Sequence, residues 1–400
     1  MARSAGFEVR YEIIQRRRAG SSTFIGSGKF RMMQDLLQRY PVDILLINGD
    51  LKPKQHFNLE NELKIECLDR VGVVLRIFSE MAKDRKARLQ VERARLEYEM
   101  PLLREWIHSA KMGEHPGFLG SGEYQVDVYY KLIRRRKRKI DQELESINIG
   151  EDLRRVHRKR RGFFLVGIAG YTNAGKSSLL RRLTGEKVVV EDRMFSTLST
   201  TVRRLKGVRK EILVSDTIGF IRDLPHFMIE SFMTTIEDIF LSDLVLLVLD
   251  SSDPLEVMEN KLETSRRILF PEIASENVIV VLNKIDLDPQ TIMESVWMIE
   301  EMLPHSPVIP ISIKEDKGLE VLLERILDRF RYNTTLRLKI PNLPPSQSFI
   351  SNLYQTTDIE EISYDTEVDL RIGCREKDLT RITREVQNLG GKVLDILSEP

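Results

Sequence analysis

One eight-residue stretch, GYTNAGKS at Gly170–Ser177, restricts the fold of this chain more than any other feature. It fits the pattern G-x-x-x-x-G-K-[ST] at every fixed position, follows an apolar run at 163–169 and leads into a leucine-rich helical pattern. In this strand, loop and helix context, backbone N–H groups of the loop can surround phosphates while Lys176 reaches the β and γ oxygens. The sequence therefore predicts a nucleotide-binding P-loop, with Ser177 as a ligand of Mg²⁺.

Two motifs further along the chain indicate which base the nucleotide carries. The sequence NKID, Asn283–Asp286, ends an apolar segment, and the Asp286 carboxylate can accept from both the ring N–H and the exocyclic amine of guanine. Adenine offers no such pair of donors and would leave the carboxylate unsatisfied. A second motif, SIK at Ser312–Lys314, stands where many GTP-binding domains carry SAK, whose backbone amide meets the guanine oxygen. Together with the P-loop, these motifs predict GTP and GDP as ligands.

The stretch DTIG, Asp216–Gly219, has the aspartate-x-x-glycine pattern of the loop beside the terminal phosphate. The next residue is Phe220, where Ras-like switches carry the glutamine that orients the attacking water. A phenyl ring neither donates a hydrogen bond to water nor accepts one from it. We therefore expect slow intrinsic hydrolysis and a partner that supplies the missing catalytic group.

The motifs follow apolar segments that alternate with helical patterns, which is typical of a doubly wound parallel sheet with its loops at the carboxyl edge. The expected strands are 163–169, 211–215, 244–250, 278–282 and 308–312. The expected nucleotide-binding residues are Gly170, Tyr171, Thr172, Asn173, Ala174, Gly175, Lys176, Ser177, Ser178, Asp216, Thr217, Ile218, Gly219, Asn283, Lys284, Asp286, Ser312, Ile313 and Lys314.

The composition limits the remaining classes of protein. The chain has 400 residues, of which 42% are apolar and 31% charged, so it can form several folded domains and is not intrinsically disordered. Its two cysteines, Cys67 and Cys374, are far apart and form no zinc motif. No apolar run reaches the roughly 18 residues of a membrane span. We expect a cytoplasmic protein with no membrane partner, monomeric when free.

Segments on both sides of the P-loop predict smaller α/β units, so the fold class is multidomain α/β. In the N-terminal segment, VRYEII, DILLIN and KIECLD are strand candidates, with helices near 30–40 and 56–63. The C-terminal segment reads as strand, helix, strand, strand, helix, strand, the order of a ferredoxin-like module. The predicted domains are an N-terminal α/β domain at 1–80, a basic helical hairpin at 81–161, the P-loop domain at 162–333 and an α+β module at 334–400.

Two apolar seams predict the hairpin. Leucines recur every seven residues from Leu89 to Leu103, and isoleucines do so from Ile133 to Ile147. Such spacing places each set along one side of a helix, as in an antiparallel pair of helices. We expect Pro101 to kink the first helix near its end.

A run of basic residues lies in the second predicted helix. Between residues 131 and 161 there are thirteen Lys or Arg and five Asp or Glu. A charge run can be no more than the solvated face of a helix, but six consecutive basic residues exceed that need and suit a series of phosphate contacts. The predicted RNA-contacting residues are Arg134, Arg135, Arg136, Lys137, Arg138 and Lys139.

Several longer segments resemble one family. The stretches FSTLSTTVRRLKG and DTIGFIRDLPHFMIESFMTTIEDI resemble the switch regions of the HflX family of ribosome-associated GTPases. DILLINGDLKPKQHFNLE and the loop GFLGSGE are also similar to HflX segments and occur in the family's order. The resemblance covers residues 8 to about 330 and is far more specific than the P-loop alone.

The resemblance implies a GTPase that binds the ribosome, its hairpin directed at the RNA of the large subunit, with nucleotide state controlling binding or subunit dissociation. It aligns Thr201 with the switch threonine that binds Mg²⁺, although Thr200 is a competing assignment. The implied Mg²⁺ ligands are Ser177, Thr201 and Asp216, and the implied catalytic residues are Lys176, Thr201 and Gly219.

Two questions stay open at the level of sequence. Asn173 stands where GTPases with a hydrophobic residue after the glycine often carry an asparagine that binds K⁺, so K⁺ is a second cofactor hypothesis; the alternative is a hydrogen bond within the loop. Alternatives of function are a nucleotide-gated RNA-binding or chaperone-like module and a tRNA-modification or signalling GTPase. A basic arm disfavours a purely signalling role. An RNA-modifying enzyme would need a second catalytic cluster, and the sequence shows none outside residues 163–314.

Overall fold

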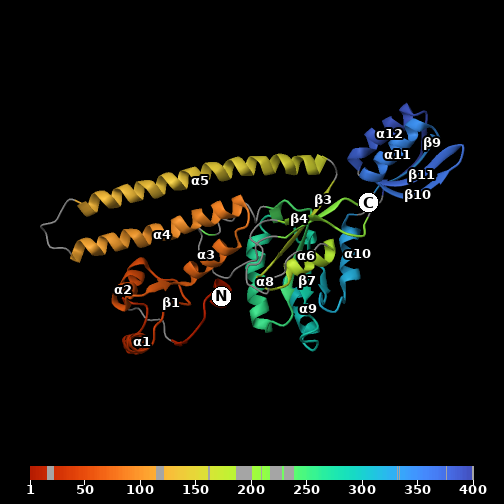
Figure 1. Cartoon of the computed structure of the whole chain (residues 1–400). Coiled ribbons are helices and arrows are strands. Elements are labelled where there is room, and N and C mark those ends of the chain that lie inside the picture. Colours follow the sequence, from red (N-terminus) through yellow and green to blue (C-terminus); the bar gives the residue numbers. More distant parts are fainter. Residues whose placement is uncertain are drawn as a thin grey trace. The chain divides into compact units, whose positions relative to one another are not determined.

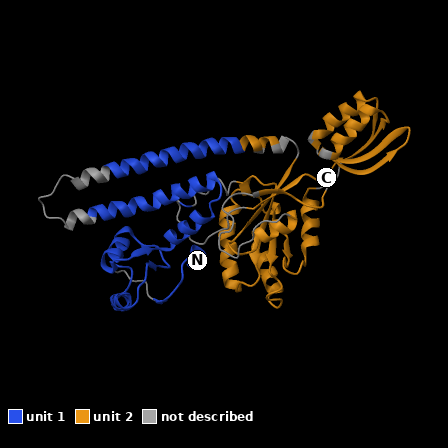
Figure 2. Ribbon diagram, in the orientation of Figure 1, with its two compact units in different colours: residues 1–151, 190–200, 221–237 blue, residues 152–189, 201–220, 238–400 orange. Residues whose placement is uncertain are grey.

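The computed structural model describes residues 1–15, 22–113, 121–160, 163–185, 201–208, 210–216, 228, 238–330, 332, 334–374 and 376–398. The chain divides into two compact units: the first takes in the described residues up to Glu151, and the second takes in almost all described residues from Asp152 onward (Figure 2). Within the described ranges, no helix has an apolar stretch long enough to cross a membrane. The multidomain α/β class predicted from the sequence is confirmed.

Unit 1 begins with a small α/β layer. Its two strands pair in parallel, with α2 as the crossover and Leu59 of that helix fully buried against Phe30 and Cys67. The elements in chain order are η1 (Arg3–Ala5), α1 (Ser27–Arg39), β1 (Ile44–Leu46), α2 (Pro53–Leu63), β2 (Glu66–Leu68) and α3 (Arg70–Met81).

One of the three expected strands is not formed. Residues 7–15, which include VRYEII, are neither strand nor helix, so the prediction was wrong there. Its apolar side chains Val9, Tyr11 and Ile14 are exposed, and only Ile13 of the VRYEII stretch packs against the core of the layer, so the alternation does not bury a whole face. Gln15 instead ties the segment to the following loop, since it donates to the Phe24 carbonyl and accepts from the Gly26 amide.

The rest of unit 1 is an antiparallel pair of long helices, α4 (Arg85–Gly113) and α5 (Ser121–Arg160) (Figure 1). Leu89 of α4 packs with Ile140 and Leu144 of α5. Ion pairs between the helices flank this seam: Lys86 with Glu151 at 2.5 Å and Arg93 with Asp141 at 2.9 Å. The predicted hairpin is confirmed, and α4 continues as helix through Pro101.

Unit 2 contains the P-loop domain, a six-stranded sheet in the order β4-β5-β3-β6-β7-β8. All neighbours are parallel except β4, an antiparallel edge strand that the sequence did not predict. Its elements are β3 (Phe164–Gly170), α6 (Lys176–Thr184), β4 (Thr201–Arg204), β5 (Ile212–Asp216), β6 (Leu244–Asp250), α8 (Leu255–Leu269), η2 (Ser275–Asn277), β7 (Val278–Asn283), α9 (Ile292–Met302), β8 (Val308–Pro310) and α10 (Leu319–Arg329).

Helices cover both faces of this sheet, as a doubly wound fold requires. Leucines of α6 and α10 enter one core, whereas α8 and α9 contribute Met258, Leu262 and Ile299 to the other. Strands β6 and β7 lie between the two layers and are almost continuously buried, which explains their unbroken apolar sequences.

The C-terminal module has the predicted order of elements. They are β9 (Thr334–Pro341), α11 (Pro344–Thr356), β10 (Asp358–Tyr364), β11 (Glu367–Cys374), η3 (Glu376–Asp378), α12 (Leu379–Asn388) and β12 (Lys392–Ser398). The sheet order β10-β11-β9-β12, antiparallel throughout, is that of a ferredoxin-like fold. Alternate residues of β9 are buried against the two helices, which covers one face of the sheet.

Candidate functional site

The predicted nucleotide motifs meet at one edge of the P-loop domain. Strands β3, β5, β6, β7 and β8 run parallel, so their carboxyl ends lie together (Figure 1). In doubly wound sheets this edge is where ligands bind. The spatial order of the strands in the sheet, and not their order along the chain, therefore decides which motifs become neighbours.

The P-loop links β3 to α6 in a backbone conformation that glycine makes possible. Gly170 has φ +135°, and a Cβ there would lie 2.3 Å from the Val248 carbonyl oxygen. Gly175 has φ +100°, and its Cβ would lie 2.3 Å from the Asn283 Nδ2. Both positions therefore exclude a side chain for two reasons, the backbone angle and the lack of space. Between them Asn173 also has a positive φ, +65°.

Lys176 is the first residue of α6 and is buried, with its Nζ donating to the Tyr171 carbonyl at 2.8 Å. Burial lowers the pKa of its ammonium group from 10.5 to about 8, and the nearby Asp216 carboxylate partly opposes that shift. The side chain is thus folded back over its own loop, where a phosphate would replace the carbonyl as its partner.

Two of the three expected Mg²⁺ ligands are in contact. The Ser177 hydroxyl donates to Asp216 Oδ2 at 2.8 Å, and both residues are buried. Thr201 starts β4 and is the direct register partner of Asp216, which brings its backbone to the same place. The side chain of Thr201 lies outside the described atoms, as do Thr200 and the stretch Thr217, Ile218, Gly219 and Phe220.

The base-reading motifs are joined by hydrogen bonds. Asn283 Nδ2 donates to the Ala174 carbonyl at 2.9 Å, and its Oδ1 accepts from the Ile313 amide at 3.4 Å. The Ser312 hydroxyl donates to Asp286 Oδ1 at 2.6 Å, which holds the pKa of that carboxyl below its ordinary value. The P-loop therefore forms one site with two motifs that follow it by more than a hundred residues in the sequence.

The structure also adds residues that the sequence reading missed. Lys284 donates from Nζ to Asp250 Oδ2 at 2.5 Å, so the last residue of β6 positions the lysine of the NKID motif. Arg182 of α6 pairs with Asp316 at 2.6 Å and thereby links the P-loop helix to the loop after β8. The signal for Asp250 was available, because it is an acidic residue at the end of an apolar strand.

The six predicted RNA-contacting residues divide into two groups on α5. Arg136 forms two hydrogen bonds with Glu92, at 2.6 and 2.7 Å, and Lys137 pairs with Glu97 at 2.5 Å, so both support the hairpin. The other four are exposed: Arg134, Arg135, Arg138 and Lys139. No carboxylate in the described part of the chain forms an ion pair with any of these four.

Comparisons with known proteins agree with this geometry. A family model described as "50S ribosome-binding GTPase" matches residues 165–284. Models described as "GTP-binding GTPase N-terminal" and "GTP-binding GTPase Middle Region" match residues 1–79 and 81–161. The GTPase HflX of Methanocaldococcus jannaschii is 40% identical over 93% of this chain and 91% of its own length.

The chain belongs to the HflX family of GTPases. A second member, the GTPase HflX of Thermococcus kodakarensis, is 41% identical over 82% of this chain and 75% of its own length. Among solved structures, the crystal structure of the SsGBP and GDP complex is 28% identical, with a TM-score of 0.50 over 82% of this chain and 92% of that one. This HflX protein therefore binds guanine nucleotides and hydrolyses GTP.

The contact between Gly175 and Asn283 gives a test of how the site is held. In the Gly175→Ala variant the methyl group displaces the Asn283 amide, and we expect affinity for GDP to fall by about tenfold or more. Gly207→Ala is the control, since Gly207 also has a positive φ, +79°, but open space around its Cβ position. The affinity of the Gly207→Ala variant for GDP, measured by calorimetry, should stay within about twofold of that of the parent protein. Equal losses in the two variants would contradict the role of the Asn283 contact.

Proposed function

We propose that this HflX protein binds the large ribosomal subunit through the α4 and α5 arm and that its nucleotide state controls the binding or the dissociation of subunits. The exposed face of α5 carries the proposal. Arg134, Arg135, Arg138 and Lys139 are exposed and form no ion pair with a carboxylate of the described residues, so their charges can meet a row of phosphates. In this proposal the protein acts in the cytoplasm and is monomeric when free.

The arm is better suited to RNA than the C-terminal module is. On the open face of that module the basic side chains are balanced by carboxylates: Arg337 pairs with Asp369 at 3.1 Å and Arg371 with Glu360 at 3.0 Å. An RNA backbone would have to displace those carboxylates before it could bind. The printed description of the family model for residues 165–284 also supports a ribosomal partner.

Within the G domain we propose roles for the site residues. Lys176 contacts the β and γ phosphates, whose negative charge favours its protonated form and opposes the burial that lowers its pKa to about 8. Ser177 and Asp216 present adjacent hard oxygen donors, which fit Mg²⁺, an ion that would neutralise phosphate charge. The backbones of Thr201 and Gly219 position the water and contact the γ-phosphate, and Asp286 reads the base.

The base assignment is tested by Asp286→Ala. Asp286 is half-buried and belongs to none of the hydrophobic cores, so the variant should fold normally but lose its preference for guanine. We expect the ratio of GDP to ADP affinity to fall by about a hundredfold, as two hydrogen bonds to a charged acceptor are removed. Ser312→Ala, which removes the partner of the carboxylate but leaves the carboxylate itself, should reduce the ratio much less. A ratio unchanged by Asp286→Ala would reject this assignment.

Ribosome binding is tested on the free face of α5. Arg135→Gln with Arg138→Gln should weaken co-sedimentation with large subunits, because two phosphate contacts are lost. The slope of log affinity against log salt should drop by about 1.4 to 1.8. Arg337→Gln with Arg371→Gln removes the same charge from the C-terminal module and should change neither quantity.

The nucleotide arm of this experiment uses GTP, GDP and a non-hydrolysable analogue. Binding that depends on nucleotide state supports the switch. Binding to free RNA but not to subunits would favour the alternative of a nucleotide-gated RNA-binding or chaperone-like module. Absence of binding to subunits in every nucleotide state would refute the proposal.

We also propose that Asn173 binds K⁺ beside the phosphates. Its side chain is exposed at the P-loop and forms no hydrogen bond with another described residue, which weighs against a purely structural role within the loop. A cation there would offset the negative charge that develops on the leaving group, which gives the site a catalytic charge although Phe220 cannot orient the attacking water. Turnover of GTP should be faster in KCl than in NaCl at equal ionic strength, and Asn173→Ala should abolish the difference while GDP affinity is retained. Equal rates in the two salts would remove K⁺ from the mechanism.

A further inference from the structure

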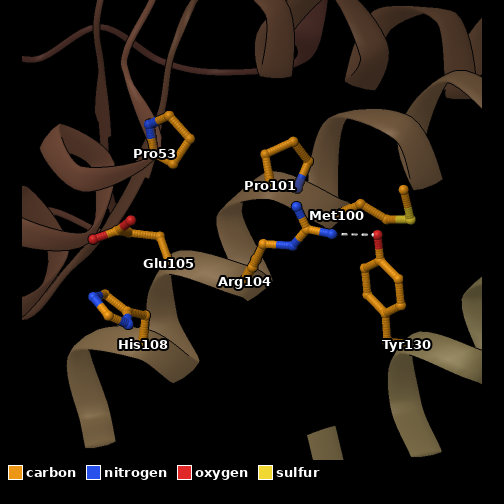
Figure 3. A pocket seen from close by; sticks show the side chains of 7 residues that line it. All are labelled: Pro53, Met100, Pro101, Arg104, Glu105, His108 and Tyr130. Atoms are coloured by element: carbon orange, nitrogen blue, oxygen red, sulfur yellow. Dashed lines mark hydrogen bonds between the residues drawn. The ribbon is translucent and has the colours of Figure 1, made fainter. Parts of the chain in front are cut away.

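A cavity of about 450 Å³ lies in unit 1, at the point where the arm meets the α/β layer (Figure 3). This volume is within the range of small-ligand sites. One part of the wall is apolar and the other is polar, and each comes from more than one helix. The apolar residues are Pro53 of α2 with Met100 and Pro101 of α4, and the polar ones are Arg104, Glu105 and His108 of α4 with Tyr130 of α5.

The polar side of the cavity carries both signs of charge, but the Arg104 guanidinium points toward Tyr130 and the Glu105 carboxylate points away from it (Figure 3). Arg104 donates from Nη2 to the Tyr130 hydroxyl at 2.6 Å, and its guanidinium carbon lies 5.1 Å from the centroid of the Tyr130 ring (Figure 3). The guanidinium carbon of Arg134 lies at the same distance from that centroid. Neither arginine forms an ion pair with a carboxylate among the residues that the structure describes. Two cations held beside one ring repel each other, and an anion between them would relieve that repulsion.

The apolar side of the cavity suits a flat group. The rings of Pro53 and Pro101 and the thioether of Met100 carry no donors, so they offer contact surface without hydrogen-bond requirements. An anion attached to a flat, partly apolar group is the chemistry of a nucleotide. Arg134 is also the first residue of the exposed basic face of α5, so the cavity lies at one end of the surface that the proposed function assigns to RNA.

We propose that this cavity takes one unpaired nucleotide of RNA, with its base against Met100 and Pro101 and its phosphate between Arg104 and Arg134. The inference rests on the proposed binding of ribosomal RNA and deepens it. A paired and stacked nucleotide has no free face to offer, so the cavity selects single-stranded RNA, whereas the cations further along α5 bind any phosphate backbone.

The test compares a single-stranded RNA of about ten nucleotides with a duplex of the same length, using the GDP-bound full chain. Arg104→Gln and Met100→Ala should each weaken binding of the single strand by about five- to tenfold and leave binding of the duplex nearly unchanged. Arg104 is exposed and Met100 half-buried, so both variants should fold. Arg135→Gln is the matched control, because it removes one arm cation outside the cavity and should weaken both RNAs alike.

Occupancy of the cavity is read separately by fluorescence. Trp106 lies on α4 beside these residues, is 40% exposed and meets Phe57 of α2 with ring centroids 5.0 Å apart. In a Trp297→Phe background it is the one remaining tryptophan of the chain. Single-stranded RNA should change its emission, and Arg104→Gln should suppress the change.

The outcomes separate this inference from the proposed function. If Arg104→Gln and Met100→Ala leave the ratio of single-strand to duplex affinity unchanged while ribosome binding persists, the cavity assignment is overturned and the proposed function stands. Competition by micromolar AMP would overturn the assignment to RNA, since it would show a site for free nucleotides. Loss of ribosome binding in the parent protein itself would instead refute the proposed function.

Discussion

The side-chain amide of Asn283 holds the catalytic edge of this protein together. It donates to a carbonyl of the P-loop and accepts from the amide that follows Ser312, so one buried group joins three loops. Because each bond uses a different atom of the amide, the loops are fixed relative to one another and not merely in contact. The same amide also explains Gly175, since any side chain at that position would occupy the space of Nδ2.

A second contact connects this edge to the place where β5 pairs with β4. Ser177 and Asp216 meet at 2.8 Å, and Asp216 is paired in register with Thr201 at the start of β4. Strand β4 is the antiparallel edge of the sheet and has one neighbour, so it has less to hold it than the inner strands. The residues proposed to hold Mg²⁺ thus connect the inner strand β5 with the edge strand β4.

The arm uses the two sides of one helix for different purposes. Ile140 and Leu144 pack on α4, and Arg136 and Lys137 extend to its carboxylates. A salt bridge to a facing helix consumes the charge that a phosphate would need, so a run of six basic residues supplies fewer RNA contacts than its composition indicates. The four cations without an ion pair are exposed, and the first of them, Arg134, lies over Tyr130, which lines the cavity.

The sequence by itself determined the elements of chemistry and most of the fold. The P-loop, NKID and the alternation of strands follow from spacing and local pattern, because those signals act over a few residues. Tertiary structure decided the rest. Strand β4 is short and rich in arginine, and it forms because it pairs with β5, not because of its own sequence pattern. The VRYEII segment has a strand-like pattern but does not pair with another strand among the described residues. Likewise, the contact of Asp250 with Lys284 and the pairing of some α5 cations with α4 carboxylates depend on which side chains the packing brings within reach. Those distances across the fold are not contained in any local sequence pattern.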